Sequence, residues 1–330
     1  MKTKLTRRTF IKTSLFASAA IPLAAQTPPR SGAPDPDAAA SARPEGPMPM
    51  GTIGGQEFSR LFIGGNLIGG WSHSRDLPYV ATLMRRYNTE AKIRETLELA
   101  ETYGVNVINT WVMQDNSALF KHWKAGGKIQ WFSQARLDPN GGFSQIQRAI
   151  DEGAVAVHLT GDTCDKLLDR GEFEKVGQSI EFMKSRKCLA GVAAHSLPAI
   201  VECEKAKLEV DFYQKTLHTH DYYTAPRADE TGPVGKHDNS WCDDPQAVVG
   251  FMAKVKKPFV AFKILAAGAI PPRAGFPYAF NSGADFILVG TFDWQIAENA
   301  NLARRVVKIV AGPNSKRMRP WYGGTPVVSS

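Results

Sequence analysis

The sequence predicts a closed (β/α)8 barrel, the TIM-barrel member of the α/β class, formed by residues 51–330. Eight short segments rich in β-branched and aromatic residues alternate with eight amphipathic stretches, which is the pattern of βα units around a parallel sheet. The length suits one such barrel. A composition of 43% hydrophobic and 22% charged residues is that of a globular domain and argues against a fibrous or polytopic membrane protein.

The alternation places each element in order along the chain. Strands are expected at 60–64, 105–109, 128–134, 154–159, 188–193, 209–214, 258–264 and 284–290. Helices are expected near 89–103, 116–125, 142–152, 172–186, 197–206, 244–256, 275–283 and 294–311. An open doubly wound sheet is the alternative architecture. It is disfavoured because the glycines of 64–70 lie far from the next helix, unlike a dinucleotide-binding turn.

Two connections after strands are unusually long, at 65–88 and 215–243. Both follow the carboxyl end of a strand, where barrels of this kind build their active sites. We therefore expect both connections to cover a site.

The first 25 residues have the features of a twin-arginine signal peptide. Arg7 and Arg8 precede Phe10 and Lys12, and the apolar run that follows is too short to span a bilayer. Residues 26–50, rich in Pro and Ala, are expected to be a disordered linker. These features predict a periplasmic protein exported by the twin-arginine machinery, with no membrane span in its mature form.

The basic charge gives little support for a nucleic-acid partner. Removing the five basic residues of segment 1–25 lowers the formal charge from +8 to +3. The remaining basic cluster, 316–319, is expected to be a solvated tail. A small-molecule substrate is expected instead. The four cysteines, Cys164, Cys188, Cys203 and Cys242, form no Cys-x-x-Cys pair and are expected to be unpaired or structural. One or two disulfides, which an oxidising compartment would allow, are the alternative.

Several segments resemble the aldo-keto reductases. Residues 54–66 are similar to that family's N-terminal hairpin and first strand, and 100–110 to its first helix and second strand. Further similarity lies in 190–196, 283–290 and 297–299. The resemblance covers nearly the whole of 51–330 and implies the same barrel.

The reductase chemistry of that family uses an Asp, a Tyr, a Lys and a His. Here Asn109 stands at the Asp position, no Tyr follows it, and the third strand ends in Gln134 rather than a Lys; His158 alone matches. Without the phenol, acid-assisted hydride transfer lacks its proton donor. The departure counts against a conventional reductase.

Polar residues at the expected strand ends form an alternative site. His158, His195 and Lys263 are the candidate catalytic residues, and we expect them to share one cavity. The candidate substrate-binding residues are Asn66, Asn109, Trp111, Gln134 and Asp162. The structural alternatives are a hydrogen-bonded His158, a helix start at His195, and an ion pair of Lys263 with Asp162 or Asp221.

Two cofactors are compatible with the sequence. His218, His220 and Asp221 lie at alternate or adjacent positions of the long sixth connection and are candidate ligands of a divalent metal, and at least one is expected in the cavity. Solvated histidines are the alternative. A tightly bound NAD(P) is the second possibility, with Gly290, Thr291, Glu298 and Asn299 resembling the end of the family's cofactor site.

Three functions follow from these features. The first is proton transfer on a sugar-like hydroxy-carbonyl compound, by an isomerase, epimerase or lyase. The second is a nicotinamide oxidoreductase that retains its cofactor. The third is a non-catalytic binding protein, in which Trp71, Trp111, Trp131 and Trp241 form a platform that stacks on sugars.

Overall fold

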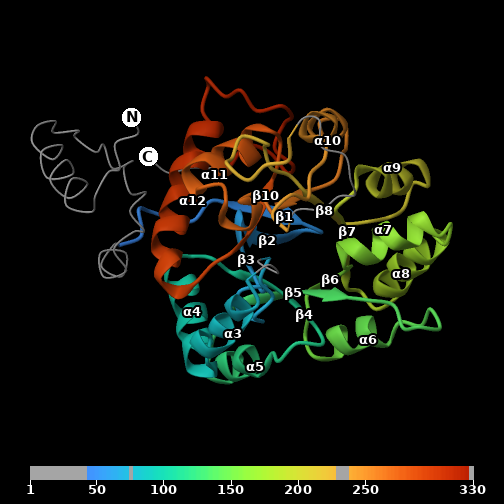
Figure 1. The fold of residues 1–330 in the computed structure, drawn as a ribbon, viewed down its shortest axis with the longest axis horizontal. Coiled ribbons are helices and arrows are strands. Elements are labelled where there is room, and N and C mark those ends of the chain that lie inside the picture. The colour runs from blue at the N-terminus through green and yellow to red at the C-terminus, as the bar shows by residue number, and fades with distance from the viewer. Residues whose placement is uncertain (1–42, 74–76, 228–237, 327–330) are drawn as a thin grey trace, which may run out of the picture. The chain divides into compact units, whose positions relative to one another are not determined.

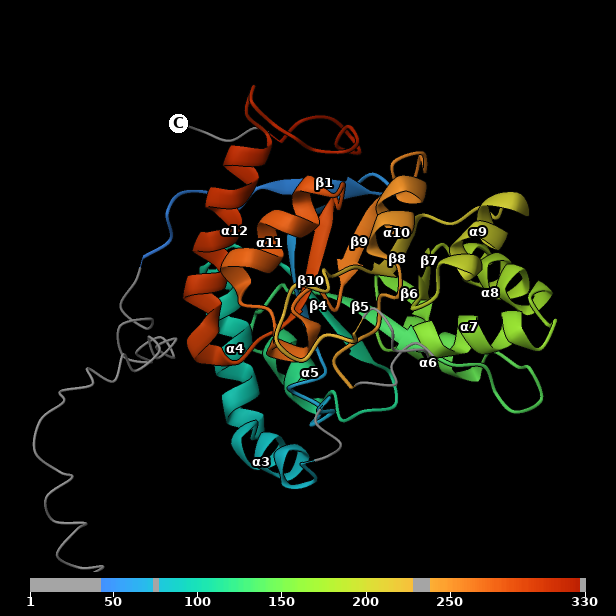
Figure 2. The same cartoon turned by 45° about the horizontal axis from the view of Figure 1, so that its top comes forward.

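The computed structural model describes residues 43–73, 77–227 and 238–326, and these residues form the predicted barrel. Its strands are β3 (Leu61–Gly64), β4 (Val107–Trp111), β5 (Gln130–Ala135), β6 (Ala156–Leu159), β7 (Leu189–Ala194), β8 (Phe212–Thr216), β9 (Phe259–Phe262) and β10 (Phe286–Gly290). All neighbours are parallel, and β10 closes on β3. Figures 1 and 2 show the helices arranged around these strands.

The helices follow the strands as the alternation predicts, with two additions. They are α3 (Tyr79–Tyr87), α4 (Glu90–Thr102), α5 (Ser117–Lys124), α6 (Ser144–Asp151), α7 (Gly161–Asp169), α8 (Glu174–Ser185), α9 (Leu197–Lys205), α10 (Pro245–Met252), α11 (Pro272–Asn281) and α12 (Ile296–Val310), with short 3₁₀ turns at Ala266–Gly268 and Asp293–Gln295. None of the helices in the described residues is long and apolar enough to cross a bilayer.

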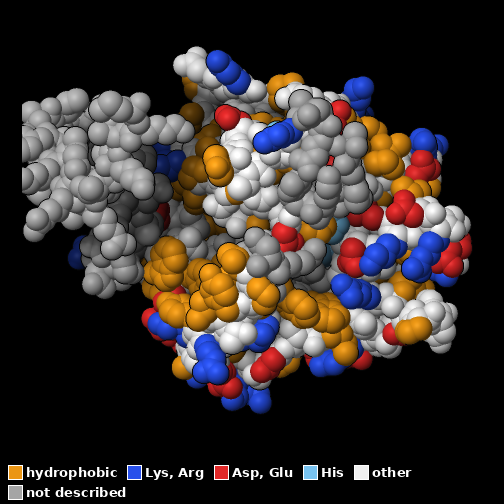
Figure 3. Space-filling model, in the orientation of Figure 1, with side chains coloured by type: hydrophobic (Ala, Val, Ile, Leu, Met, Phe, Trp, Pro, Cys, Tyr) orange, Lys and Arg blue, Asp and Glu red, His pale blue; other side chains and the backbone are white. Residues whose placement is uncertain are grey.

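The two additional helices, α3 and α7, correct the sequence-based expectation. Helix α3 lies inside the connection 65–88, and it has no buried residue, so the sequence carries no core-facing stripe there. Figure 3 shows apolar side chains gathered over this region, where Leu77, Tyr79 and Leu83 are exposed. Helix α7 begins two residues after β6 and therefore lies at the mouth of the barrel.

A β-hairpin closes the opposite end of the barrel. Strands β1 (Met50–Ile53) and β2 (Gln56–Ser59) pair through Gly54 and Gly55, whose φ angles of 56° and 82° suit a tight two-residue turn. The ring of Phe58 packs edge-on against Phe132 at 4.9 Å between centroids, inside the barrel. The hairpin thus seals the amino-terminal end and leaves the carboxyl end for a site.

Residues 43–50, which the sequence assigned to a disordered linker, pack on the barrel. Met48 is buried in the core, and the backbone N–H of Glu45 donates to Asn301 on α12. The folded part therefore begins before residue 51. The expected signal peptide (1–25) and residues 26–42 of the linker lie outside the described residues.

The C-terminal tail also differs from expectation, because Arg317 and Arg319 are buried instead of solvated. Both guanidinium groups lie beside the buried carboxylate of Asp285, at 2.7 and 3.6 Å. The indole of Trp321 lies between Arg60 and Arg317, with the guanidinium carbons 4.3 and 3.7 Å from the ring centroid. The tail therefore covers the hairpin end of the barrel (Figure 2).

All four cysteines are buried and free, so none of the possible disulfides forms among them. Burial raises the pKa of the Cys188 and Cys203 thiols to about 12, so neither is a thiolate at neutral pH. They act as small apolar core residues.

Candidate functional site

A cavity of about 760 Å³ opens at the carboxyl ends of the strands. Its walls come from the ends of β3 to β6 and β8 to β10, from the residues that follow β7 and from the start of α7. His158, His195 and Lys263 all line it. Among the expected binding residues, Asn66, Trp111, Gln134 and Asp162 line it as well. This volume suits a small organic ligand.

His158 is a structural anchor of the cavity floor. Its Nδ1 faces the carbonyl of Leu159 at 2.9 Å and so carries the proton, which leaves Nε2 to accept a hydrogen bond from Asn109, also at 2.9 Å. The ring is completely buried, and this burial lowers the pKa of His158 to about 4. With both nitrogens engaged, His158 is neutral and poorly placed for proton transfer, contrary to its expected catalytic role.

Three amide side chains continue this network into the cavity. Asn109 accepts a hydrogen bond from Gln134 at 2.8 Å and donates to Gln214 at 3.3 Å. Asn109 itself is completely buried, whereas Gln134 and Gln214 line the cavity. Asn109, Gln134, Gln214 and His158 thus form a neutral network that presents two amides to a ligand.

His195 is held by a carboxylate that lies 30 residues earlier in the chain. Asp165 on α7 accepts hydrogen bonds from the backbone N–H of His195 at 3.0 Å and from ring Nδ1 at 3.1 Å. It also accepts from the backbone N–H and hydroxyl of Ser196. Since Nδ1 donates to Asp165, Nε2 is the basic nitrogen that the ring can present to a ligand.

The environment of this pair keeps His195 neutral and Asp165 charged. Burial lowers the pKa of His195, and the charges of Lys263 and Lys215 add to that effect against the opposing charge of Asp165. Burial acts to raise the pKa of Asp165, but the hydrogen bonds from His195 and Ser196 outweigh it and the net shift is downward. The pair is therefore a partly buried carboxylate that orients a neutral imidazole.

Glycine at position 161 permits this arrangement. A Cβ at Gly161 would lie 2.8 Å from Cε1 of His195, closer than side chains normally pack. The first turn of α7 can therefore approach the ring only because residue 161 has no side chain.

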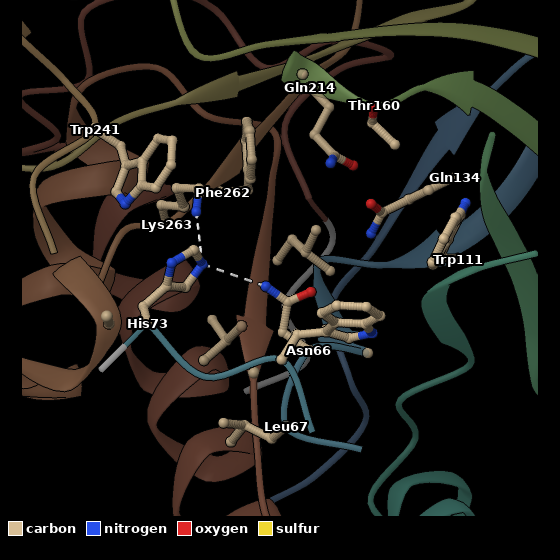
Figure 4. A pocket seen from close by; sticks show the side chains of 18 of the residues that line it. Asn66, Leu67, His73, Trp111, Gln134, Thr160, Gln214, Trp241, Phe262 and Lys263 are labelled. Carbon is tan, nitrogen blue, oxygen red and sulfur yellow. Dashed lines mark hydrogen bonds between the residues drawn. The ribbon is translucent and has the colours of Figure 1, made fainter. Parts of the chain in front are cut away.

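Lys263 follows β9 in a strained backbone conformation. Its φ is 56°, and Ala266 and Ala267 have φ angles of 45° and 56°, a left-handed region that costs other residues about 1–2 kcal/mol each. The Nζ atom lies 2.7 Å from Nε2 of His73 and 4.0 Å from the ring centroid of Trp241 (Figure 4). Clustered strain of this kind is typical of functional sites.

His73 contacts this lysine, and Asn66 and Asp238 flank the His73 ring. Asn66 lies 3.4 Å from Nε2 of His73, and Asp238 lies 3.4 Å from Nδ1 of the same ring. Figure 4 shows Lys263, His73 and Asn66 on one side of the cavity and the amides of Gln134 and Gln214 across from them.

Asp162 contacts groups other than Lys263. It accepts a hydrogen bond from Thr160 at 2.6 Å and lies 3.5 Å from Arg136 and 3.2 Å from Lys166. Because Asp162 is held at the cavity rim by these groups, an ion pair with Lys263 does not form.

Three of the four expected aromatic residues lie at the cavity. Trp71 and Trp111 meet edge to face at 5.8 Å, and Trp241 packs against the ring of His195 at 4.7 Å. Trp131 instead is fully buried between strand and helix, where its indole N–H donates to Thr110. Trp71, Trp111 and Trp241 therefore line the cavity, and Trp131 does not.

The expected metal ligands do not converge. Nδ1 of His218 donates to the carbonyl of Thr219, while Nε2 accepts from the backbone N–H groups of Trp241 and Cys242. Nε2 of His220 lies 2.6 Å from the carbonyl of Cys242, and neither it, His218 nor Asp221 is among the cavity-lining residues described. The described residues contain no group of three His, Cys, Asp or Glu side chains able to hold a metal.

These histidines have a different effect, because they fix the segment that carries Trp241. His218 is buried, and this burial lowers its pKa to about 4, so the neutral ring keeps both backbone hydrogen bonds. The long connection between β8 and α10 is thereby tied back at Trp241 and Cys242.

The expected nicotinamide site fits the structure poorly. Gly290 lines the cavity. Thr291 is buried, and its hydroxyl donates a hydrogen bond to the carbonyl of Val289. Asn299 is buried within α12. Glu298 pairs with the exposed Arg273. Only one of the four residues reaches the cavity, so this set of residues does not fit a nicotinamide.

Sequence reasoning missed Asp165, His73 and Gln214. Gln214 ends a predicted strand and could have been found by the rule that selected Gln134. Asp165 and His73 lie in segments expected to be connections, and the contacts that matter join them to residues far along the chain.

Two of the buried histidines, His158 and His218, predict an acid-sensitive fold. The pKa of each lies near 4 in the folded protein, below an ordinary value of 6.5, so the unfolded chain takes up protons first. Their stabilisation is complete above pH 6.5 and is lost as the pH falls towards 4, by roughly 2 kcal/mol each between pH 7 and 5. Urea unfolding at both pH values measures this loss. His218→Asn should remove about half of it, and equal stability at pH 7 and 5 would contradict the assignment.

Comparison with known proteins identifies similar folds. No family model matches the sequence, and no curated protein matches it. Among solved structures, a protein from Pseudomonas aeruginosa described as an aldo-keto reductase has a TM-score of 0.54 at 17% identity, covering 78% of this chain and 96% of its own. An aldo-keto reductase from Bacillus halodurans has a TM-score of 0.52 at 12% identity, covering 81% and 98%. The chain therefore has a (β/α)8 barrel fold similar to that of aldo-keto reductases.

Proposed function

We propose that the protein is an enzyme that transfers a proton on a small, sugar-like hydroxy-carbonyl compound, with isomerase, epimerase or lyase chemistry. One observation carries the proposal: His195, oriented by Asp165, and Lys263 line the same cavity. A neutral imidazole is a base able to work near neutral pH, and an ammonium group is a proton donor.

The two groups suit complementary steps. Nε2 of His195 would remove a proton from the carbon beside a carbonyl, while Lys263 would stabilise the negative charge that develops on the oxygen. Trp241 contacts both side chains and holds them on one wall of the cavity. This arrangement needs no hydride, in keeping with the replacement of the family's Asp and Lys by Asn109 and Gln134.

The remaining walls suit a polyhydroxylated ligand. Gln134 and Gln214 offer both donors and acceptors, which is what hydroxyl groups require. Trp71 and Trp111 supply apolar ring surface beside them. Both features support a sugar-like substrate.

Isotope exchange tests this function without knowledge of the product. The protein is incubated in D₂O with aldoses, ketoses and sugar acids, without added nicotinamide, and deuterium at the carbon beside the carbonyl is measured by mass spectrometry. We expect catalysed exchange with at least one compound. Lys263→Met should reduce its rate at least about 100-fold. Lys256→Met, at an exposed lysine before β9, should leave the rate unchanged.

Other outcomes overturn the proposal. Exchange or turnover that appears only on addition of NAD(P) would make the protein an oxidoreductase. A compound that binds tightly without exchange or turnover would make it a binding protein. Equal exchange rates in Lys263→Met and the parent would remove Lys263 from the reaction.

A further inference from the structure

A second lysine, Lys215, lies behind the cavity wall and has no role in the function proposed above. It belongs to β8, where Gln214 points into the cavity, so Lys215 points to the opposite face of the strand, between barrel and helices. Its side chain is completely buried. Burial lowers the pKa of Lys215 to about 8, with Cys242, Asp165 and Asp243 opposing.

The ammonium group reaches across to the end of the neighbouring strand. In the register of β7 and β8, Lys215 lies opposite Ala194, the residue before His195. Its Nζ donates to the carbonyl of His195 at 2.6 Å and to the carbonyl of Thr216 at 3.0 Å.

His195 is therefore held from two sides. Asp165 accepts from its backbone N–H and from ring Nδ1, and Lys215 donates to its backbone carbonyl. Thr216 adds a hydrogen bond from its hydroxyl to the carbonyl of Ala194. The backbone at the end of β7 cannot turn away without breaking these bonds.

A buried ammonium group is a costly way to hold a carbonyl. An apolar side chain of similar volume would avoid the desolvation of the charge and is often neutral or stabilising at such positions. A lysine here is consistent with a role other than stability, and its nearest functional neighbour is His195.

We infer that Lys215 is a positioning residue for His195, fixing its backbone and placing a positive charge behind the ring. The inference rests on the proposed function in one respect, because that function assigns His195 as the base. It deepens that function by assigning a buried residue to the control of the base.

The charged groups around His195 give the expected direction of its effect. They are Asp165 on α7, Lys215 on β8 and Lys263 after β9. The two lysines disfavour a charged imidazole, and Asp165 favours it. Removal of Lys215 should therefore raise the pKa of His195, by about one unit for a charge at this range in a partly buried site.

The test follows the His195 ring by NMR in protein labelled at histidine, with His195→Gln used to assign its signal. In Lys215→Met we expect the midpoint of the His195 titration to rise by about one pH unit. Lys215→Arg, which retains the charge, should stay near the parent. Lys205→Met, at an exposed lysine on α9, is the matched control.

Lys215→Gln separates charge from hydrogen bonding, and it also serves if Lys215→Met does not fold. It keeps a donor for the carbonyl but has no charge, so its titration should move as in Lys215→Met. An unmoved titration in a folded, uncharged variant overturns the inference. Once a substrate has been identified, kinetics of the Lys215 variants should show a larger fall in kcat than rise in KM. The NMR result does not require turnover, so it stands apart from failure of the proposed function.

Discussion

Replacement of His195 by Gln is expected to lower kcat for the proposed proton transfer by about 10²–10⁴-fold, the range that general base catalysis supplies. Glutamine has no basic nitrogen, while its size and polarity resemble those of the imidazole. KM should change little, because Gln134, Gln214 and the aromatic walls remain. Steady-state kinetics on the compound found by isotope exchange measures both constants.

Asp165 should act through His195, and a double variant shows whether it does. In Asp165→Asn the amide can donate to Nδ1, which would place the ring proton on Nε2 and leave the cavity without its base. We expect a loss comparable to that of His195→Gln. The double variant should lose no more than His195→Gln alone, because the two residues act as a unit. Additive losses would show that Asp165 has a separate role.

The barrel was predictable from sequence because each strand is marked by the same physical requirement. Strands enclosed on both faces need continuous apolar runs, and β9 and β10 show them clearly. The two missed helices lack such a signal: α3 buries no residue at all, and α7 buries only Gly161, Cys164 and Leu167.

The candidate site was predictable only where strand ends define it. Asn109, Gln134 and His158 lie towards the carboxyl ends of neighbouring strands, and the barrel register brings them into one network. The expected metal ligands follow β8 instead, in a connection whose course no periodicity describes. There His218 satisfies backbone N–H groups of the same connection, a role that a sequence pattern does not distinguish from metal binding.

The C-terminal tail shows that the pairing of charged residues is also hard to predict from the sequence. The cluster 316–319 looks solvated because its sequence has no counter-charge nearby. Its partner is Asp285, which lies more than 30 residues earlier in the chain. The carboxylate of Asp285 accepts hydrogen bonds from the guanidinium group of Arg317 and from the backbone N–H of Tyr322. Long-range pairing of this kind is set by the closed barrel.

Asp285→Ala is therefore expected to destabilise the protein by about 3–5 kcal/mol, the range for removing one partner of a buried ion pair. The carboxylate is completely buried and also accepts from the backbone N–H of Phe259 at 3.0 Å. Its loss leaves the guanidinium groups of Arg60, Arg317 and Arg319 together without their counter-charge. Burial already lowers the pKa of Arg317 to about 9, against the opposing effect of Asp285.

Urea unfolding of the parent and of the Asp285→Ala variant measures this loss. Glu45→Ala removes a half-exposed partner of Arg305 and should cost less than about 1 kcal/mol, because solvent screens that pair. If Asp285→Ala does not fold, Asp285→Asn keeps the size and one acceptor and should show a smaller loss. Unfolding midpoints equal to that of Glu45→Ala would mean that the arginines are held by the surrounding carbonyls alone, which accept from Arg317 at 2.7 Å.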